Sequence, residues 1–527
     1  MIENLPGPLT ARHSALRVAF VGDQGLPWLG QAVDSRLVDP KDLAEAMQTI
    51  EDWAQLLIVD HNPGGRWSGR LTTVLSGARD ADVPVVGIAG RGVGAADGFS
   101  VLQVGSRIAP GVDVVGPALD PLVHRPRALS SPQDATGILA VEQPPLRGPE
   151  AMRKLLRPWL PRAGAVVLPW VAEPGFDDGV WTVGSGSTID ADHGSVVIVT
   201  EDGHASAWSR ATHIAETVAG GMPVITTGTA DSGLDGLLPA TLIASSGTPL
   251  SYLQTPEARE RLGVLQRREA LRELASWAHW DRLRALLHLP VPPLPSVSVL
   301  LPTLRREFLA GALAHVEQQT YPRLDLVLVL HGDEWPDSLP EVDALEMPVS
   351  VVRVGGSVSF GDALNEGTLA ARGDFLAKMD DDDWYSREHI WDLVLAYEHA
   401  EADIVGKAAE WLYLAELDIT VRRLADGAEW PSRTIAGGTL LMLRDDLRRV
   451  GGWRSVGRSV DQELIGAIHD AGGSSFRTHG YGYVLHRHDD GHTWSIDSDY
   501  FLRDTSVQYR GLRLDVAMVG DIEGSES

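Results

Sequence analysis

Four consecutive carboxylates, Asp380 to Asp383, are the side chains of this sequence with the clearest chemical potential. They follow the apolar segment 375–379 directly and precede Trp384 and Tyr385. Carboxylates in such a row repel one another unless they are solvated or share a cation. Hard carboxylate oxygens suit Mg²⁺ or Mn²⁺, ions that commonly bridge to substrate phosphates. A solvated acidic turn is the alternative. The apolar segment before this acidic cluster and the aromatic pair after it favour a cation site in the wall of a pocket.

The charge balance of the whole chain sets a condition on any such site. Its 527 residues include 72 Asp and Glu against 45 Lys and Arg, which gives a formal net charge of −27. A field of this sign repels nucleic acid and anionic lipid at long range, so we expect no nucleic-acid partner. An anionic substrate would need a bound cation or a local cluster of Arg. Because the sequence has no cysteine, disulfides, thiolate metal sites and Cys nucleophiles are excluded.

Alternating strands and helices lead up to the acidic cluster. Apolar runs of strand length at 297–301, 324–330, 349–354 and 374–379 predict strands, with helical segments at 308–319 and 360–371. In open α/β sheets, ligands bind beyond the carboxyl ends of the strands. Asp380 follows the last of these strands directly, so the acidic cluster stands where a ligand is expected.

The part of the chain before these strands shows the same alternation. Its apolar runs predict parallel sheets of the doubly wound kind and lie at 16–21, 56–60, 83–88, 112–115, 165–169 and 196–200. A helical stretch at 256–288 is followed by four prolines before residue 296, which favour an extended spacer. We therefore expect an α/β protein of three parts: Rossmann-like subdomains at 1–130 and 131–290, and a third domain at 291–527.

Three further segments accompany the acidic cluster in a characteristic order. They are Val297-Ser-Val-Leu-Leu-Pro-Thr303, Ala363-Leu-Asn-Glu-Gly367 and Ala371-Arg-Gly-Asp374, and Phe375-Leu-Ala-Lys-Met-Asp-Asp-Asp-Asp-Trp-Tyr385 follows at once. In order and spacing, residues 296–500 resemble the family 2 glycosyltransferases, which have the GT-A fold. The resemblance implies that the domain at 291–527 binds a nucleoside diphosphate sugar, uses Mn²⁺ or Mg²⁺ as cofactor, and transfers the sugar.

The same resemblance implies a role for each matching residue. Asp380 and Asp382 match the D-x-D pair, with Asp382 as a metal ligand and Asp380 in contact with the ribose or the metal shell. By its late position in the chain, His488 is expected to complete the metal or diphosphate site. The residues expected to bind the donor are Thr303, Asp333, Asn365, Asp380, Gly438, Trp453 and Arg487.

Several of these residues have a purely structural alternative. Thr303 suits a turn at the end of a strand, and Gly438 suits an ordinary turn. Trp453 could fill the core as well as stack on a sugar ring. The histidines at 486, 488 and 492 could be solvated, or could form a zinc site of their own.

An inverting transfer also needs a carboxylate that takes the proton of the attacking hydroxyl. The resemblance places this base at Asp461, with Glu463 as the second candidate, and both precede an apolar helical segment at 464–469. An acid at the start of a helix is favoured by the helix dipole and often only caps the helix. Capping is therefore the structural alternative for Asp461.

The N-terminal part resembles a second class of glycosyltransferase, the GT-B type. The resemblance rests on residues 117–126, on Ser209-Arg-Ala-Thr-His-Ile-Ala-Glu216 and on Ala219-Gly-Gly-Met-Pro-Val-Ile225. It implies a module that either binds a second donor or serves an acceptor, a partner or self-association into a homo-oligomer.

Together these features predict an inverting, metal-dependent glycosyltransferase that acts on a glycan, a glycolipid or a cell-surface polymer precursor. The alternatives are a bifunctional enzyme with a second, GT-B-type donor site, a non-catalytic glycan- or nucleotide-binding scaffold, and a nucleotidyltransferase. The N-terminus lacks the pattern of a signal peptide, and no apolar stretch is long enough to span a bilayer. We therefore expect a cytoplasmic protein, membrane-peripheral only through a partner or substrate.

Overall fold

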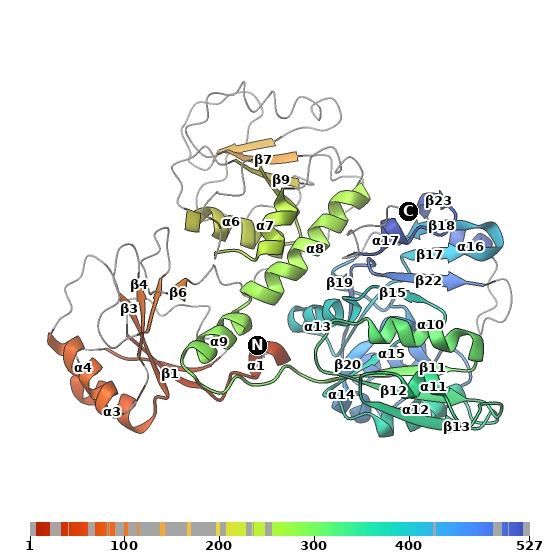
Figure 1. Cartoon of the computed structure of the whole chain (residues 1–527), viewed down its shortest axis with the longest axis horizontal. Coiled ribbons are helices and arrows are strands. Elements are labelled where there is room, and N and C mark those ends of the chain that lie inside the picture. Colours follow the sequence, from red (N-terminus) through yellow and green to blue (C-terminus); the bar gives the residue numbers. More distant parts are fainter. Residues whose placement is uncertain are drawn as a thin grey trace. The chain divides into compact units, whose positions relative to one another are not determined.

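The computed structural model contains two compact units, whose described residues run up to residue 293 in the first and from residue 294 in the second (Figure 1). The residues that it describes are 7–21, 33–39, 42–61, 69–81, 83, 85–89, 100–103, 113–114, 138–142, 166–169, 196–200, 207–227, 234, 237–247, 256–424, 428–488, 498–503 and 505–519. Residues 117–126 and the end of the histidine tract, after residue 488, lie outside the described residues. Among the described residues, no helix combines the length and apolar character needed to cross a membrane.

The first unit contains a parallel sheet in the order β2-β1-β3-β4-β5-β6. Its strands are β1 (Arg17–Val21), β2 (Asp34–Leu37), β3 (Leu56–His61), β4 (Val85–Ala89), β5 (Ser100–Gln103) and β6 (Asp113–Val114). Successive side chains of a strand point to opposite faces. Phe20 accordingly packs with Trp280 of α9 (Ser276–Leu286), whereas Val21 packs with α3 (Leu43–Asp52) and α4 (Gly69–Asp80). Helices therefore cover both faces of this sheet.

A second parallel sheet of the same unit has the order β10-β9-β7-β8. Its strands are β7 (Ile138–Glu142), β8 (Val166–Pro169), β9 (Val196–Thr200) and β10 (Val224–Thr227), and the nearby helices are α6 (Ala207–Ala219), α7 (Ala240–Ser246) and α8 (Pro256–Leu274). Gln266 of α8 accepts from the Val224 amide and donates to the Val224 carbonyl, each at 2.7 Å. The Gln266 side chain thus forms hydrogen bonds with backbone groups of β10, an edge strand, that would otherwise be unpaired. The GT-B-like role of this unit stays a prediction.

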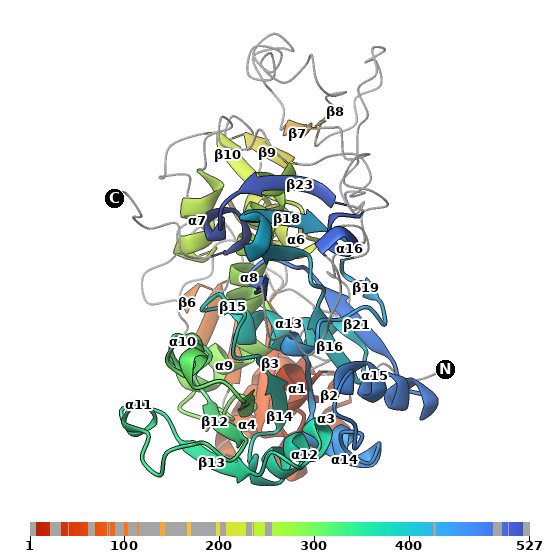
Figure 2. The same cartoon turned by 90° about the vertical axis from the view of Figure 1, so that its right-hand side faces the viewer.

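The second unit is built on a mixed sheet in the order β13-β12-β11-β14-β20-β16-β21-β19. Its strands are β11 (Val297–Thr303), β12 (Leu324–His331), β13 (Val349–Val354), β14 (Phe375–Lys378), β16 (Ile404–Lys407), β19 (Trp430–Pro431), β20 (Leu441–Leu443) and β21 (Ser475–Thr478). The first four strands of that order run parallel, whereas β20 runs antiparallel to β14 and β16. Helices α10 (Arg306–Glu317) and α13 (His389–Ala400) lie on one face, and α12 (Phe360–Ala370), α14 (Arg444–Arg449) and α15 (Val460–Asp470) on the other (Figure 2).

The core of this unit explains why its strands read as apolar runs. Parallel strands covered on both faces are buried throughout, and all seven residues of β11 are buried. Leu300 and Val329 lie beneath α12, where Gly367 faces them. A Cβ at Gly367 would lie 2.5 Å from side-chain carbons of both residues. The glycine therefore lets α12 rest directly on the two strands that lead to the site.

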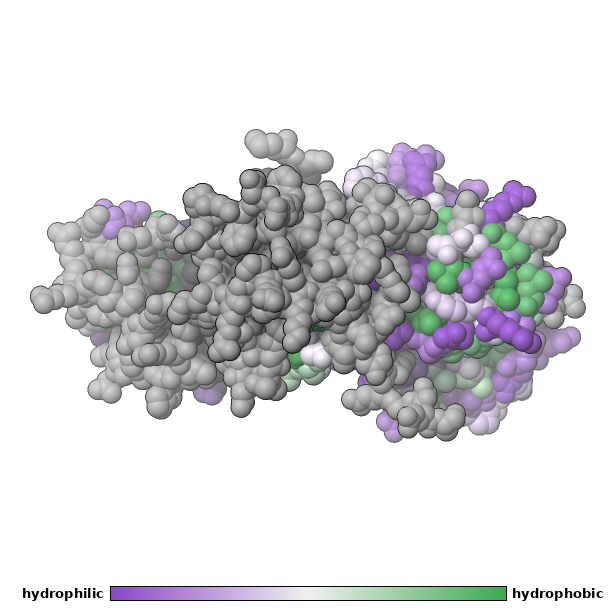
Figure 3. All heavy atoms as spheres, turned by 90° about the horizontal axis from the view of Figure 1, so that it is seen from above, coloured by the Kyte–Doolittle hydropathy of each residue, from purple (hydrophilic) through white to green (hydrophobic). Residues whose placement is uncertain are grey.

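A smaller sheet in the order β15-β22-β17-β18-β23 adjoins the acidic cluster. Its strands are β15 (Trp384–Tyr385), β17 (Trp411–Leu414), β18 (Ile419–Arg423), β22 (Tyr483–Arg487) and β23 (Thr505–Arg510). Because β15 pairs with β22, the late residues near Arg487 are brought next to a strand that directly follows Asp383. Seen from the side of β18, β23 and α16 (Ser498–Leu502), apolar and polar residues are interspersed on the surface of this unit (Figure 3).

One buried histidine of this unit has a consequence for stability. His389, the first residue of α13, is fully buried beside the rings of Tyr385 and Tyr483. Neither of its ring nitrogens makes a hydrogen bond with the described residues. Burial, and secondly the charge of Lys407, lowers the pKa of His389 well below the ordinary 6.5.

His389 should therefore make the protein less stable in mild acid. Below about pH 6.5 the unfolded chain takes up a proton on this residue that the folded chain does not, so the free energy of unfolding falls as the pH falls. In a His389→Leu variant this slope should be shallower, and near pH 5.5 the variant should be more stable by roughly 1 kcal/mol. Urea unfolding followed by tryptophan fluorescence at several pH values measures both quantities. Equal slopes in the two proteins would contradict the assignment.

Candidate active site

Three of the residues singled out in the sequence stand at one edge of the large sheet. Thr303 ends β11, Asp333 comes just after β12, and Asp380 comes just after β14. These three strands run in the same direction, so their carboxyl ends meet at the same edge. This is the edge at which ligands bind in open α/β sheets.

Asp380 is held by contacts from several directions. Its carboxylate forms an ion pair with the buried Lys378, and its amide donates to the Tyr385 hydroxyl at 2.7 Å. That hydroxyl donates in turn to the Gly438 carbonyl at 3.0 Å. Although burial disfavours the charge on Lys378, the carboxylates of Asp380 and Asp461 raise its pKa above the ordinary value. Asp380 is thus a positioned, charge-balanced carboxylate.

The candidate base Asp461 lies beside the same backbone turn. This turn, η4 (Gly437–Thr439), contacts both α15 and β14. A Cβ at Gly437 would lie 2.9 Å from the Asp461 carboxyl oxygen Oδ2, and a Cβ at Gly438 would lie 2.8 Å from Asp380 Oδ2. The two carboxylates therefore approach successive glycines, and the charge of each acts on Lys378. Ser459 occupies the cap position of α15, so Asp461 is inside the first turn and does not cap the helix.

A residue that the sequence reading missed, Arg305, contacts the middle of the acidic cluster. Its Nη2 atom lies 2.8 Å from Asp382 Oδ2 and also pairs with Asp381 Oδ1. The other oxygen of Asp381 accepts from the Thr303 hydroxyl at 2.6 Å. Burial raises the pKa of Asp381, and Arg305 opposes that shift. Thr303 is therefore both a turn residue and a partner of the acidic cluster.

Asp383 attaches the acidic cluster to the smaller sheet. It accepts from the Tyr483 hydroxyl at 2.7 Å and from the His486 amide at 2.9 Å. Burial, followed by the charges of Asp382 and Asp380, raises its pKa well above the ordinary value. The fourth carboxylate thus has a structural use that is separate from the D-x-D pair.

The attachment by Asp383 brings the late residues of the sequence to the cluster. The charge of Asp382 acts on Arg487, whose pKa burial lowers. The ring of His488 lies 4.8 Å from that of Phe308, and Phe308 lies 4.6 Å below the Arg305 guanidinium. The histidine and the arginine chosen from the sequence therefore lie on the same side of the domain as Asp382.

The side-chain amide of Asn365 forms two hydrogen bonds with the backbone of Trp453. The Asn365 amide donates to the Trp453 carbonyl at 2.8 Å and accepts from the Trp453 amide at 2.9 Å. The Trp453 ring is 3% exposed and packs in the core, and its Nε1 donates to Thr368. Of the two roles considered for Trp453, the structure shows core packing. Asn365 holds the loop that carries Trp453.

Asp333, which was expected to bind the donor, lies two residues after the end of β12, and its role stays a prediction. It is exposed, and its Oδ1 accepts from the Gly356 amide at 3.1 Å in the loop after β13. Gly332 before it has φ +112°, a conformation that favours glycine. The carboxylate thus links the ends of the adjacent strands β12 and β13.

The donor set at this edge suits a hard divalent cation. Carboxylates of the D-x-D pair are the ligands that Mg²⁺ and Mn²⁺ prefer, and a cationic group already contacts Asp382 Oδ2. Within the described part of the chain, no group of three or more His, Cys, Asp or Glu side chains could hold a metal ion alone. Mg²⁺ commonly takes one or two carboxylates plus substrate phosphates. The residues therefore fit a metal whose shell is completed by the substrate.

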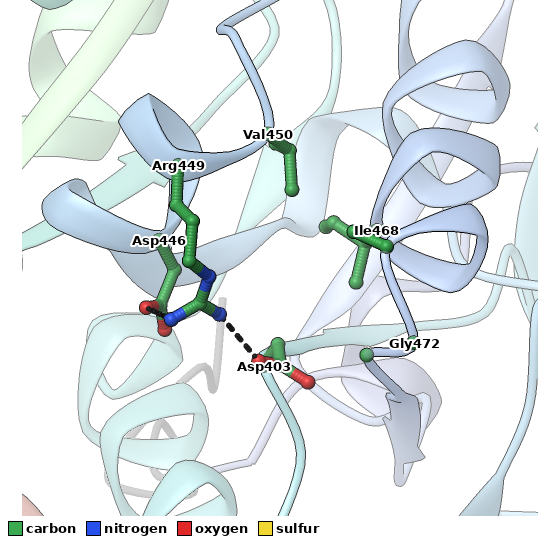
Figure 4. Close-up of a pocket in the computed structure, with 8 residues that line it drawn as sticks. Asp403, Asp446, Arg449, Val450, Ile468 and Gly472 are labelled. Carbon is green, nitrogen blue, oxygen red and sulfur yellow. Dashed lines mark hydrogen bonds and ion pairs between the residues drawn. The ribbon is translucent and has the colours of Figure 1, made fainter.

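A pocket of about 160 Å³ lies away from these residues (Figure 4). It is lined by Asp403, Asp446, Arg449, Val450, Ile468, Ala471, Gly472 and Gly473. Asp403 precedes β16, which runs in the same direction as β14, so the pocket lies at the opposite edge of the sheet from Asp380. Arg449 pairs with both Asp403 and Asp446 at 2.9 Å. Because Arg449 already pairs with both carboxylates, and none of the residues expected in the site lines this pocket, we assign the chemistry to the edge at Asp380.

The sheet order, the acidic cluster and its partners coincide with a known family. Residues 298–460 match the family model of glycosyl transferase family 2. The resemblance to family 2 glycosyltransferases is thereby confirmed for the second unit, over less than half of the whole chain. The matched span begins within β11, includes the acidic cluster and ends one residue before Asp461. Asp461, Glu463, Arg487 and His488 therefore lie beyond the match.

Solved glycosyltransferase structures are similar to the chain at low identity. The mannosyltransferase PcManGT from Pyrobaculum calidifontis, in complex with GDP-Man and Mn²⁺, is 18% identical with a TM-score of 0.31, over 40% of this chain and 65% of that one. GalNAc-T7 with UDP, GalNAc and Mn²⁺ is 13% identical with a TM-score of 0.30, over 37% and 44%. TarS 1–349 of S. aureus with UDP-GlcNAc is 13% identical with a TM-score of 0.31, over 39% and 63%. The similarity thus covers 44% to 65% of their lengths. A search of curated proteins finds no match.

The second unit should be sensitive to any side chain at Gly438. In Gly438→Ala the new Cβ would lie 2.7 Å from the Tyr385 hydroxyl and 2.8 Å from Asp380 Oδ2, so Asp380 must move. We expect a loss of about 1–3 kcal/mol in stability and roughly tenfold weaker nucleotide binding, measured by thermal unfolding and calorimetry. The control is Gly311→Ala in α10, where a Cβ meets nothing within 4 Å. Unchanged nucleotide affinity in Gly438→Ala would argue against Asp380 as a donor contact.

Proposed function

We propose that the second unit transfers a sugar, with inversion, from a nucleoside diphosphate sugar to a hydroxyl of a glycan, a glycolipid or a cell-surface polymer precursor. The observation that carries the proposal is the approach of Asp461 to Gly437 and of Asp380 to the next residue, Gly438. The family match over residues 298–460 supports glycosyl transfer. The base, the metal dependence, the stereochemistry and the acceptor class are what the proposal adds.

The proposed reaction is a single displacement at the anomeric carbon. The acceptor oxygen forms its bond to that carbon as the bond to the diphosphate breaks. Asp461 accepts the proton of the acceptor hydroxyl during the attack, and an inverted product results. Glu463, two residues further along α15, is exposed and is the second candidate for this role.

The leaving diphosphate needs positive charge in a strongly acidic protein. A divalent cation held by Asp382, with Asp380 beside it, would neutralise the leaving group when bound. Among this chain's own side chains, Arg305 lies against Asp382, and the charge of Asp382 acts on Arg487. Asp333 and Thr303, at the ends of neighbouring strands, would orient the nucleoside part of the donor.

A donor screen tests the proposal directly. The purified chain is incubated with a panel of nucleotide sugars and Mn²⁺, and released nucleoside diphosphate is measured with and without EDTA. We expect metal-dependent release from at least one donor, and an inverted anomeric configuration in the transfer product by NMR. Release of pyrophosphate instead would identify a nucleotidyltransferase. Nucleotide binding without any turnover, across a broad panel of acceptors, would support the scaffold alternative.

A further inference from the structure

One guanidinium joins the two middle carboxylates of the acidic cluster. Arg305 precedes α10 and uses the same atom, Nη2, for Asp381 Oδ1 and for Asp382 Oδ2 at 2.8 Å. The side chain of Arg305 is 27% exposed, that of Asp382 15% and that of Asp381 6%. The arginine is therefore bound to a buried carboxylate and a more accessible one at once.

The two carboxylates differ in what else holds them. Asp381 accepts from the Thr303 hydroxyl at 2.6 Å, and Thr303 also contacts the Arg305 backbone through its hydroxyl at 3.2 Å. Asp381 therefore keeps a fixed partner whatever the Arg305 side chain does. Asp382 is the more exposed of the two, and its ion pair is with Arg305. Arg305 therefore joins a carboxylate that Thr303 also holds to one that is more open to solvent.

We propose that Arg305 is an exchangeable counter-ion of Asp382. A divalent cation takes its place on Asp382, and Arg305 keeps Asp381 and turns its remaining N–H groups to the donor diphosphate. This inference rests on the proposed function, because it uses Asp382 as the metal ligand. Arginine suits the exchange because its planar fork of five N–H donors can contact a carboxylate and a phosphate together.

The exchange makes cation binding and diphosphate binding cooperative. A cation alone must compete with Arg305 for Asp382, whereas a cation with a diphosphate gives Arg305 a new anionic partner. Coupling of this kind is reciprocal, so each ligand strengthens the binding of the other by the same factor. The Phe308 ring, 4.6 Å from the guanidinium, gives the arginine a surface along which to turn. Because the chain has a formal net charge of −27, the positive charge of Arg305 beside the diphosphate offsets the repulsion between the protein and this anion.

Two binding measurements on the full-length chain test the exchange. Free Mn²⁺ is titrated by electron paramagnetic resonance without nucleotide, and GDP and UDP are each titrated by calorimetry at a fixed excess of Mn²⁺. In Arg305→Gln we expect Mn²⁺ alone to bind roughly three- to tenfold more tightly, because its competitor is gone. The better-binding nucleoside diphosphate should bind about tenfold more weakly. The change in opposite directions is the signature of exchange.

Two further variants guard against a simple structural effect. Arg306→Gln removes the adjacent arginine, which is 49% exposed and pairs with Glu341, and it should leave both affinities unchanged. Arg305→Lys keeps the charge but not the fork, so it should shift both affinities in the same directions by less. If Arg305→Gln does not fold, as judged by circular dichroism, the lysine variant carries the test.

The outcomes separate this inference from the proposed function. Mn²⁺ affinity that is unchanged or weaker in Arg305→Gln, while Asp382→Asn abolishes Mn²⁺ binding, overturns the exchange and leaves the metal site standing. No Mn²⁺ binding by the wild type or by Arg305→Gln, with or without nucleotide, removes the metal site and the exchange with it. Binding too weak to detect in the wild type that becomes measurable in Arg305→Gln supports the exchange.

Discussion

Asp382→Asn should reduce Mn²⁺-dependent release of nucleoside diphosphate by roughly a thousandfold or more, because the leaving group loses its cation. The fold should survive the change. Asp382 is partly exposed, and the buried contacts of the cluster are made by Asp381 with Thr303 and Arg305. The assay is initial-rate diphosphate release over a range of Mn²⁺ concentrations, with thermal unfolding measured in parallel.

A surface aspartate provides the matched control for this variant. Asp445, on α14, has a side chain that is 85% exposed. Asp445→Asn makes the same change of charge and should leave the rate unaltered. Activity of Asp382→Asn within a factor of about two of the wild type would remove the role assigned to the acidic cluster, since losing a metal ligand costs far more. A matching fall in both variants would point to the change of net charge instead.

Asp461→Asn should lower kcat by about a hundred- to ten-thousandfold while nucleotide affinity stays near that of the wild type. The amide keeps the shape of the side chain against Gly437 but cannot accept the proton of the acceptor hydroxyl. A role confined to the chemical step should appear in kcat and leave the binding of Mn²⁺ and nucleotide unchanged. Steady-state transfer kinetics and calorimetry on the same preparation measure the two effects.

Glu463→Gln separates the two candidate bases. Both acids are in the first turn of α15, so both substitutions alter the helix dipole interaction equally. If Asp461 is the base, Glu463→Gln should retain most of the wild-type rate. The reverse pattern would transfer the role to Glu463. Asp470→Asn, at the other end of the same helix, serves as the neutral control.

The strands and helices around the site were predictable because their signals are local. A continuous apolar run predicted β12, and the helical segment expected at 360–371 matches α12 to within one residue at its end. The acidic cluster could be placed at a strand end because β14 is short, buried and directly before it. Such patterns depend on neighbouring residues and on the periodicity of strand and helix, both of which are visible in one sequence.

Arg305 shows the limit of this reasoning. Its partner Asp381 is 76 residues away in the chain, and an arginine after a strand gives no sign of which carboxylate it will meet. Trp453 shows the same limit in the other direction, since only packing against the core distinguished a structural tryptophan from one that stacks on a sugar.

Local patterns were enough to predict that a row of carboxylates follows a buried strand, that the unit is α/β, and that its motifs follow the order of family 2 glycosyltransferases. Three contacts are visible only in the folded chain. Asp461 and Asp380 approach the adjacent glycines Gly437 and Gly438, respectively. Asp383 accepts from the His486 amide of β22, and Arg305 bridges Asp381 and Asp382. The physical reason is the range of the interactions. Hydrophobic periodicity is written in adjacent residues, whereas ion pairs and close backbone approaches arise only when distant segments pack together.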